Sequence, residues 1–286
     1  MRTSLAFLKL IARLPTRVQF RLGTFLGAFL YYLPTQLKYI TDVNIKLCFP
    51  ELDPESKRTL IKKNFRSLGI GLLETAIAWW APEQNIHFSN KIIGLEHVQA
   101  VLKKGKGALL LGPHFTCLEM IARIMIDHLD FAVMYRPHKN PMIAELQQEF
   151  RQKKIHYIPR NNMRELVRSL QNNKAIWYAY DIDAGFKRSV FAPFFNIPTA
   201  SLTTVARVVS LTDTTIIPVR FYRRDDCSGY DIIFSPPLTA FPTEDSLENA
   251  TRLNQFLEQV IREKPEQYIW QYKRFKTRPL GEKRFY

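Results

Sequence analysis

The feature that most constrains the fold is an apolar run, Ala108–Gly112, followed by a proline and then by an amphipathic stretch, Leu118 to Leu129. A short apolar run that ends in Gly-Pro predicts a buried strand, and apolar residues at spacings of three and four predict a helix. His114 lies at the corner between them, and Glu119 falls in the first turn of the expected helix. Such corners are where α/β proteins usually bind ligands.

The same alternation of apolar runs and amphipathic stretches continues from about Ile92 onward. It predicts an α/β fold, with a mixed, mainly parallel sheet flanked by helices. The expected strands are Ala108–Gly112, Phe131–Tyr135, Ile155–Ile158, Ala175–Tyr180, Thr214–Phe221 and Tyr230–Phe234. The expected helices in this part are Leu118–Leu129, Pro141–Lys153, Met163–Asn172, Leu202–Leu211 and Ser246–Arg262. Residues 42–80 are also helical in pattern, with a break at 49–54 where Asp53 and Pro54 predict a new helix start.

The spacing of His114 and Glu119 decides whether they can meet. On one continuous helix, residues five apart point about 140° away from each other, so they would not touch. They can touch if His114 precedes the helix, and Thr116 to Glu119 matches a capping box that would start the helix there. A histidine held by a carboxylate is a general base for activating a hydroxyl. The alternative is that Glu119 only caps the helix and His114 is a loop histidine.

Polar residues follow two further expected strands. Arg136 comes directly after Phe131–Tyr135, where an arginine can hold a phosphate with two hydrogen bonds, although it is also compatible with an exposed turn. Asp181 and Asp183 follow Ala175–Tyr180 and could bind a metal or position polar groups. A polar turn is favoured over a metal site, because no third or fourth acidic ligand lies nearby in the sequence.

Three other features are open to a functional interpretation. Phe191–Phe195 is an aromatic segment that could line an acyl-chain pocket as an exposed loop or simply pack in the core. Cys117 invites a role as a thiol nucleophile, which we disfavour because its side chain need not face His114. No GxGxxG or Walker motif is present, so a nucleotide cofactor is not indicated.

Charge and cysteine content narrow the choice of partners. The net charge of +15 is compatible with nucleic acid, an anionic membrane surface, or acidic proteins and phosphorylated substrates. No zinc-finger spacing, RNA-binding signature or basic tail favours nucleic acid, so we expect no nucleic-acid partner. Three widely separated cysteines, Cys48, Cys117 and Cys227, form no metal or disulfide framework and suit a reducing cytosol.

The N-terminal segment indicates a membrane surface. Residues 1–41 contain six basic residues and no acidic one, and Arg13, Arg17 and Arg21 share one helical face. The apolar run from Leu22 to Leu33 is too short to span a bilayer, which takes roughly twenty residues. We therefore expect residues 1–34 to form an amphipathic or obliquely inserted membrane anchor and residues 35–286 to form a single domain. The alternative is an ordinary basic surface helix.

Eight segments form a pattern that extends over nearly the whole chain. They are Asn44–Leu52 (NIKLCFPEL), Gly112–Glu119 (GPHFTCLE), Tyr135–Pro141 (YRPHKNP), Pro159–Leu166 (PRNNMREL), Trp177–Gly185 (WYAYDIDAG), Phe191–Phe195, Pro265–Trp270 (PEQYIW) and Arg274–Glu282 (RFKTRPLGE). In these segments the chain resembles the late (secondary) acyltransferases of lipid A biosynthesis, most of all the lauroyl-type members. The histidine followed by an acid after four residues is shared with all glycerolipid acyltransferases, including those acting on lysophospholipids. Its combination with the closing segments is far more specific.

The resemblance implies a role for each candidate residue within an acyltransferase domain at 35–286. His114 would be the general base, Glu119 its orienting carboxylate, and Arg136 a cation that positions substrate. Asp181 and Asp183 would support substrate binding, although the family often has Asp-Gln-Asp where this chain has isoleucine between the aspartates. No metal and no redox or other cofactor would be required.

The resemblance also implies substrates and a location. The donor would be an acyl-acyl carrier protein carrying laurate or a similar chain. The acceptor would be the hydroxyl of a 3-hydroxyacyl chain on the phosphorylated, Kdo-bearing lipid A precursor. The protein would bind the anionic lipid surface at the cytoplasmic face of a bacterial inner membrane. The alternatives are a lysophospholipid or glycolipid acyltransferase with the same dyad, and a membrane-associated binding protein in which the His/Glu pair serves structure only.

Overall fold

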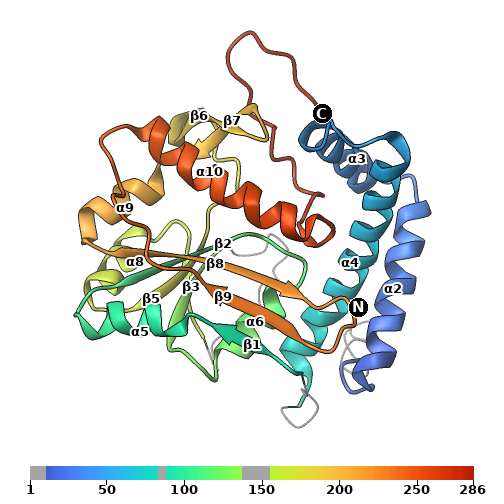
Figure 1. Ribbon diagram of the computed structural model, residues 1–286, viewed down its shortest axis with the longest axis horizontal. Helices are drawn as coiled ribbons and strands as arrows, with labels where there is room; N and C mark the ends of the chain where they lie inside the picture. The colour runs from blue at the N-terminus through green and yellow to red at the C-terminus, as the bar shows by residue number, and fades with distance from the viewer. Residues whose placement is uncertain (1–10, 83–87, 137–154) are drawn as a thin grey trace.

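The described part of the chain forms one seven-stranded sheet with a separate two-stranded hairpin, shown in Figure 1. This computed structural model describes residues 11–82, 88–136 and 155–286. The large sheet has the order β1-β9-β8-β2-β5-β3-β4. Its strands are β1 (Lys91–Ile93), β2 (Ala108–Gly112), β3 (Phe131–Tyr135), β4 (His156–Pro159), β5 (Ala175–Ala179), β8 (Thr215–Arg223) and β9 (Tyr230–Phe234).

The sheet is mixed and mainly parallel, which confirms the predicted fold class. The five neighbouring strands from β8 to β4 all run in the same direction. At the other edge β9 is antiparallel to β8, and β1 runs parallel to β9. β2 is buried along its whole length, because it lies between β8 and β5 and is covered on both faces.

Helices cover the sheet and extend beyond it. The described helices are α2 (Thr16–Tyr32), α3 (Gln36–Cys48), α4 (Pro54–Trp80), α5 (Leu95–Lys103), α6 (Leu118–Met125), α8 (Met163–Gln171), α9 (Thr204–Thr212) and α10 (Ser246–Glu263), with short 3-10 turns η2 (Phe186–Arg188) and η3 (Pro265–Gln267). The break predicted before Pro54 is confirmed, since the Asp53 side chain accepts the backbone N–H groups of Glu55 and Ser56. The helix expected over 141–153 lies outside the described residues.

The segment Phe191–Phe195 belongs to the hairpin of β6 (Ser189–Phe194) and β7 (Ile197–Leu202) rather than to an exposed loop. Phe194 and Phe195 are buried, so this segment packs in the core. Phe195 and Asn196 both have positive φ and make the two-residue turn. The sequence did not reveal this hairpin because its turn lacks the usual Asn-Gly signal.

Helices α2, α3 and α4 lie beside the sheet, at the right of Figure 1. α2 packs closely along α4, and glycines allow the close contact: a Cβ on Gly27 would come within 2.1 Å of the Phe65 carbonyl oxygen. The opposite face of α2 stays exposed. Within the described ranges, no helix combines the length and the apolarity needed to cross a bilayer.

Candidate active site

Polar residues gather where four neighbouring parallel strands end. His114 follows β2, Asp181 follows β5, Arg136 follows β3 and Arg160 follows β4. Because the carboxyl ends of parallel strands meet at one edge of the sheet, residues far apart in the chain come together there. His114, Arg136 and Asp181, all candidates from the sequence, share this edge.

His114 and Asp181 form a direct pair. β2 and β5 are in register with Gly112 opposite Ala179, so the residue two positions beyond each strand is His114 on one side and Asp181 on the other. The Nδ1 of His114 lies 2.6 Å from Oδ1 of Asp181, and the backbone N–H of His114 donates to Oδ2 at 2.9 Å. One carboxylate therefore fixes both the backbone and the ring of His114, and it favours the neutral tautomer with its hydrogen on Nδ1.

The electrostatics of the pair raise the basicity of the histidine. Burial disfavours the charged imidazolium, but the charge and the hydrogen bond of Asp181 outweigh it and raise the pKa of His114 above its ordinary value. For Asp181, burial opposes ionisation, yet its contacts with His114 hold the pKa of the carboxyl below its usual range. The Asp181 side chain is 1% exposed and that of His114 is 38% exposed, so the histidine is the partner that a substrate can reach.

Glu119 occupies a different position from the one expected. We predicted that it would orient His114, but the carboxylate on Nδ1 of His114 is that of Asp181. Glu119 lies in the first turn of α6, and its Oε2 accepts a hydrogen bond from Nε1 of Trp79 at 2.9 Å. It lines the same pocket as His114, so it remains a candidate for contact with substrate. Its catalytic role stays a prediction.

The capping box proposed for Thr116 and Glu119 is not formed. The N-cap of α6 is Cys117, and no side chain caps this end. The hydroxyl of Thr116 is instead 2.8 Å from the hydroxyl of Ser67, which belongs to α4. Contact with α4 is very close here, since a Cβ on Gly71 would lie 2.5 Å from the Thr116 carbonyl oxygen. Packing against a neighbouring helix, rather than a local cap, therefore places the start of α6.

The C-terminal segment holds the other side of the loop that contains His114. The carbonyl of His114 accepts the N–H of Ile269, and the N–H of Thr116 donates to the carbonyl of Gln267. Between these bonds Phe115 is fully buried and packs edge-on against Tyr268. Residues 112–119 and 265–270, two of the segments that resemble the same family, therefore pair with each other in the fold.

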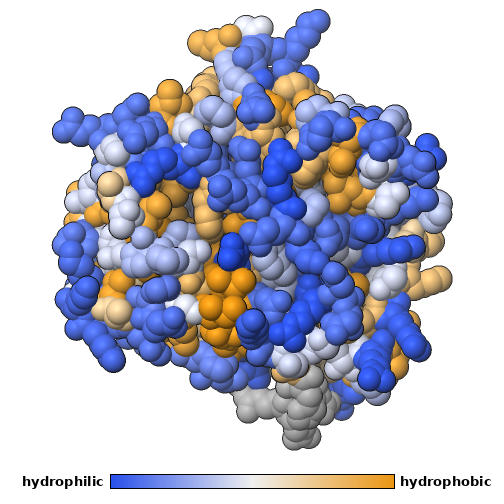
Figure 2. Space-filling view, viewed as in Figure 1, coloured by the Kyte–Doolittle hydropathy of each residue, from blue (hydrophilic) through white to orange (hydrophobic). Residues whose placement is uncertain are grey.

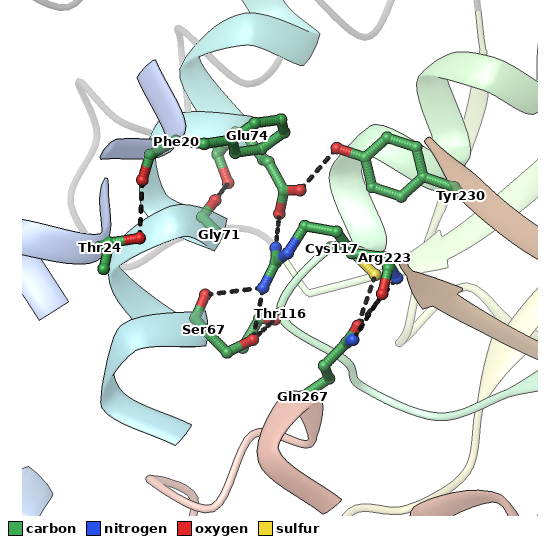
Figure 3. Close-up of polar contacts among 11 residues, drawn as sticks. Phe20, Thr24, Ser67, Gly71, Glu74, Thr116, Cys117, Arg223, Tyr230 and Gln267 are labelled. Carbon is green, nitrogen blue, oxygen red and sulfur yellow. Dashed lines mark hydrogen bonds and ion pairs between the residues drawn. The ribbon is translucent and has the colours of Figure 1, made fainter. Parts of the chain in front are cut away.

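A buried polar cluster, drawn in Figure 3, contacts the loop that contains His114. Arg223 at the end of β8 donates to Glu74 of α4 at 2.5 Å and to the hydroxyl of Ser67 at 2.6 Å. Tyr230 donates to the second oxygen of Glu74 at 2.6 Å. Ser67 in turn contacts Thr116, so hydrogen bonds run from this cluster to within two residues of His114. We did not single out these residues from the sequence, since their contacts join segments about 150 positions apart.

Two adjoining pockets open beside His114. One, of about 260 Å³, is lined by His114, Glu119, Arg136 and mainly apolar side chains that include Phe131 and Trp177. The other, of about 310 Å³, is lined by His114, Arg136, Arg160 and both aspartates. Both pockets are mainly apolar, and the second contains more charged side chains than the first.

Asp183 forms hydrogen bonds to its own turn and to the C-terminal segment rather than to His114. Its carboxylate accepts the backbone N–H and the hydroxyl of Thr277, and it also accepts the N–H of Gly185. It thereby ties the turn after β5 to the C-terminal segment. No group of three or more His, Cys, Asp or Glu residues among the described positions is arranged to hold a metal ion. The two aspartates position polar groups, which is one of the roles considered for them.

Comparison with known proteins identifies the family. The family model for bacterial lipid A biosynthesis acyltransferases matches residues 3–277. The chain belongs to this family. It is 35% identical to the lipid A biosynthesis lauroyltransferase of Escherichia coli K12, over 95% of this chain and 90% of the relative. It is also 35% identical to the lipid A biosynthesis palmitoleoyltransferase of the same organism, over 99% of this chain and 92% of the relative.

The protein is accordingly an acyltransferase, and its cysteines are unsuited to carry the acyl group at this site. Cys117 is fully buried, and its Sγ faces the Gln267 side chain at 4.0 Å. Burial raises the pKa of the Cys117 thiol to about 12, so little thiolate forms at neutral pH. At the strand ends the imidazole of His114 is a partly exposed group that can accept a proton.

Proposed function

We propose that this acyltransferase moves an acyl chain, laurate or one of similar length, from an acyl-acyl carrier protein to a hydroxyl on the Kdo-bearing lipid A precursor. The observation that carries the proposal is the His114–Asp181 pair, which leaves Nε2 of a half-exposed imidazole available beside two pockets. The names of the relatives at 35% identity support lipid A as the acceptor.

The proposed chemistry uses His114 as general base and then as general acid. The hydroxyl oxygen of the acceptor attacks the thioester carbonyl carbon while Nε2 takes the hydroxyl proton. The tetrahedral intermediate collapses, the carbon–sulfur bond breaks, and the imidazolium returns the proton to the departing thiolate. The products are an ester and a carrier protein with a free thiol. Asp181 holds the ring and stabilises the imidazolium, as the acid does in hydrolase triads.

The two pockets suggest how the substrates are arranged. The pocket with Phe131 and Trp177 is suited to the apolar acyl chain, and the one with Arg160 and the aspartates is suited to polar parts of a substrate. A net charge of +15 favours association with an acidic carrier protein and with an anionic phosphorylated acceptor. Glu119, on the wall of the first pocket, is the second carboxylate of the proposed site.

We also propose that the protein binds the cytoplasmic face of the inner membrane through α2. Its outer face has an exposed apolar stripe at helical spacing, formed by Val18, Leu22, Phe25, Phe29 and Tyr32. Phe25 and Tyr32 are each 74% exposed, and a contiguous exposed apolar patch of this kind is typical of a membrane or protein interaction site. Arg13, Arg17 and Arg21 are exposed at the same end of the chain. In Figure 2, hydrophobic and hydrophilic surface adjoin along the margin where Figure 1 draws α2.

Acyl transfer by the purified protein in detergent tests the enzymatic proposal. Lauroyl-acyl carrier protein is the donor, and the tetra-acylated precursor with its two Kdo sugars is offered beside a lysophospholipid. We expect a laurate-sized mass gain on the lipid A precursor, which His114→Ala reduces by about 10²–10⁴-fold. The matched control is His128→Ala, because His128 is an exposed histidine just after α6 and lines neither pocket.

Each result has a defined meaning. Transfer to the lysophospholipid alone would replace the proposed acceptor with a phospholipid. Full activity of a folded His114→Ala variant would remove the histidine from the mechanism. Equal losses in His114→Ala and His128→Ala would point to a general disturbance rather than to a missing base.

Binding to vesicles tests the membrane proposal. Replacing Arg13, Arg17 and Arg21 by Gln should weaken binding to anionic vesicles by about 100-fold, because each cation near such a surface contributes about 1 kcal/mol. Binding to neutral vesicles should change little. Unchanged partitioning of the triple variant on anionic vesicles would contradict an electrostatic role for this face of the helix.

A further inference from the structure

Arg136 and Arg160 lie next to each other where β3 and β4 end, at the pocket that also contains His114. β3 and β4 pair in parallel with Tyr135 opposite Pro159, so the following residues, Arg136 and Arg160, are the next pair in register. The backbone N–H of Arg160 donates to the carbonyl of Tyr135 at 2.8 Å, which holds the two strand ends together. Adjacent strands are about 4.8 Å apart, so the two side chains start within reach of one small anion.

Both arginines line the 310 Å³ pocket that also contains His114, Asp181 and Asp183. The two aspartates are already occupied: Asp181 binds the ring and backbone of His114, and Asp183 binds Thr277 and Gly185. Among the described residues, no ion pair joins Arg136 or Arg160 to a carboxylate. Both arginines are exposed.

We propose that Arg160, paired with Arg136, completes a phosphate-binding subsite beside His114. Two guanidinium groups on neighbouring strand ends can hold a phosphate from two sides, each with paired N–H donors. Among the described residues neither arginine forms an ion pair with the two aspartates of the pocket, so a bound phosphate would supply a negative partner for both. A lysine at either position would offer a point charge without the paired donors.

The subsite rests on the proposed function, since both substrates of that function carry phosphate. One such group is the phosphodiester that joins the pantetheine arm of the donor to its carrier protein. The other is a phosphate of the acceptor. Both present the same chemistry, and phosphate-free versions of each substrate distinguish them.

Equilibrium binding tests the subsite without turnover. The wild-type site and Arg160→Met are compared in the His114→Ala background, so that no transfer occurs during the measurement. The donor probes are lauroyl-phosphopantetheine and lauroyl-pantetheine, which lacks the phosphate. The acceptor probes are the bisphosphorylated precursor and its fully dephosphorylated form, which lacks both phosphates. Arg164→Met is the control, because Arg164 is an exposed arginine four residues away that lines neither pocket.

We expect Arg160→Met to weaken binding of one phosphorylated probe by about tenfold and to leave its phosphate-free counterpart unchanged. Loss on the donor pair assigns the subsite to the pantetheine phosphate, and loss on the acceptor pair assigns it to the lipid. Arg160→Lys should recover only part of the loss, and Arg164→Met should bind all four probes like the parent.

Two results would overturn the proposal. One is a similar change with phosphorylated and phosphate-free probes, which would mean that Arg160 supports the pocket without binding phosphate. The other is no change with any probe. The binding readout also separates this proposal from the enzymatic one. If the wild-type protein transferred no acyl group yet bound phosphorylated probes through Arg160, only the proposed function would fail.

Discussion

Two buried carboxylates in this protein each bind a basic side chain, but one of these basic side chains is partly exposed and the other is buried. Asp181 and Glu74 are each 1% exposed. The partner of Asp181, His114, is 38% exposed, whereas the partner of Glu74, Arg223, is 4% exposed. In the first pair one ring nitrogen remains available to exchange a proton with substrate. In the second pair, the guanidinium of Arg223 donates to Glu74 and Ser67, and the side-chain amide of Gln267 binds the backbone of Arg223, so the cluster is sealed.

The difference indicates a division of roles. The sealed cluster connects α4, β8 and the loop that contains His114 through Ser67 and Thr116, so it helps to fix where His114 lies. The open pair adjusts the basicity of the histidine and keeps it accessible. Disturbing the open pair should therefore affect catalysis more than stability, and disturbing the sealed pair should do the reverse.

The largest expected effect comes from Asp181→Asn. The two oxygens of Asp181 accept from the ring and from the backbone of His114, whereas an amide offers only one oxygen and places an NH₂ group against a donor. The variant should lose about 10²–10⁴-fold in kcat, because the correct tautomer is no longer held. Steady-state transfer assays measure this loss, and Asp213→Asn, at an exposed aspartate far from the site, is the control.

The pH profile gives this prediction a second readout. The base must be neutral to act, so activity falls as the pH drops through the pKa of His114. Because Asp181 raises that pKa, the acid limb of the wild-type profile should lie above the ordinary value for histidine, and it should move to lower pH in Asp181→Asn. An acid limb that stays in place would show that Asp181 does not set the basicity of the histidine.

The next effect is on stability and concerns the sealed pair. Arg223→Met leaves Glu74 ionised and buried without its cation, which typically costs about 3–5 kcal/mol. Urea unfolding should therefore show a much lower midpoint than in Asp181→Asn. The double variant Glu74→Leu with Arg223→Met should recover part of the lost stability, since no uncompensated charge remains. If Arg223→Met unfolds at the wild-type midpoint, the proposed division of roles is wrong.

The contrast between the pairs also shows what could be predicted from the sequence. The apolar runs that became β2, β3 and β9 have the predicted boundaries, and Asp53 and Pro54 mark the start of α4 as expected, because these signals are local. His114 and Arg136 were singled out because each follows such a run. Register and strand order are not local properties. Nothing near His114 in the chain reveals that Gly112 lies opposite Ala179, and this register brings Asp181, rather than Glu119, to Nδ1.

Long-range packing accounts for the other differences. Thr116 has the spacing of a helix cap, but a hydroxyl on α4 takes its hydrogen bond. Glu74 and Arg223 are ordinary charged residues in the sequence and become a buried pair only when α4 crosses the end of β8. Arg160 became a candidate for the same reason, because only the register of β3 and β4 places it beside Arg136.

The smallest expected effect is that of Glu119→Gln, which distinguishes the role of Glu119 from that of Asp181. Glu119→Gln keeps the size of the side chain but removes the charge that accepts from Trp79, and a hydrogen bond to a charged group contributes about 1.5–3 kcal/mol. We expect kcat to fall by about 10–100-fold, less than in Asp181→Asn, with the acid limb of the pH profile unchanged, because Asp181 still holds Nδ1. Trp79→Phe, which removes the donor and retains an aromatic ring, should show part of the same loss. A shift of the acid limb in Glu119→Gln as large as that in Asp181→Asn would mean that both carboxylates act on the imidazole during turnover, as the spacing of His114 and Glu119 first suggested.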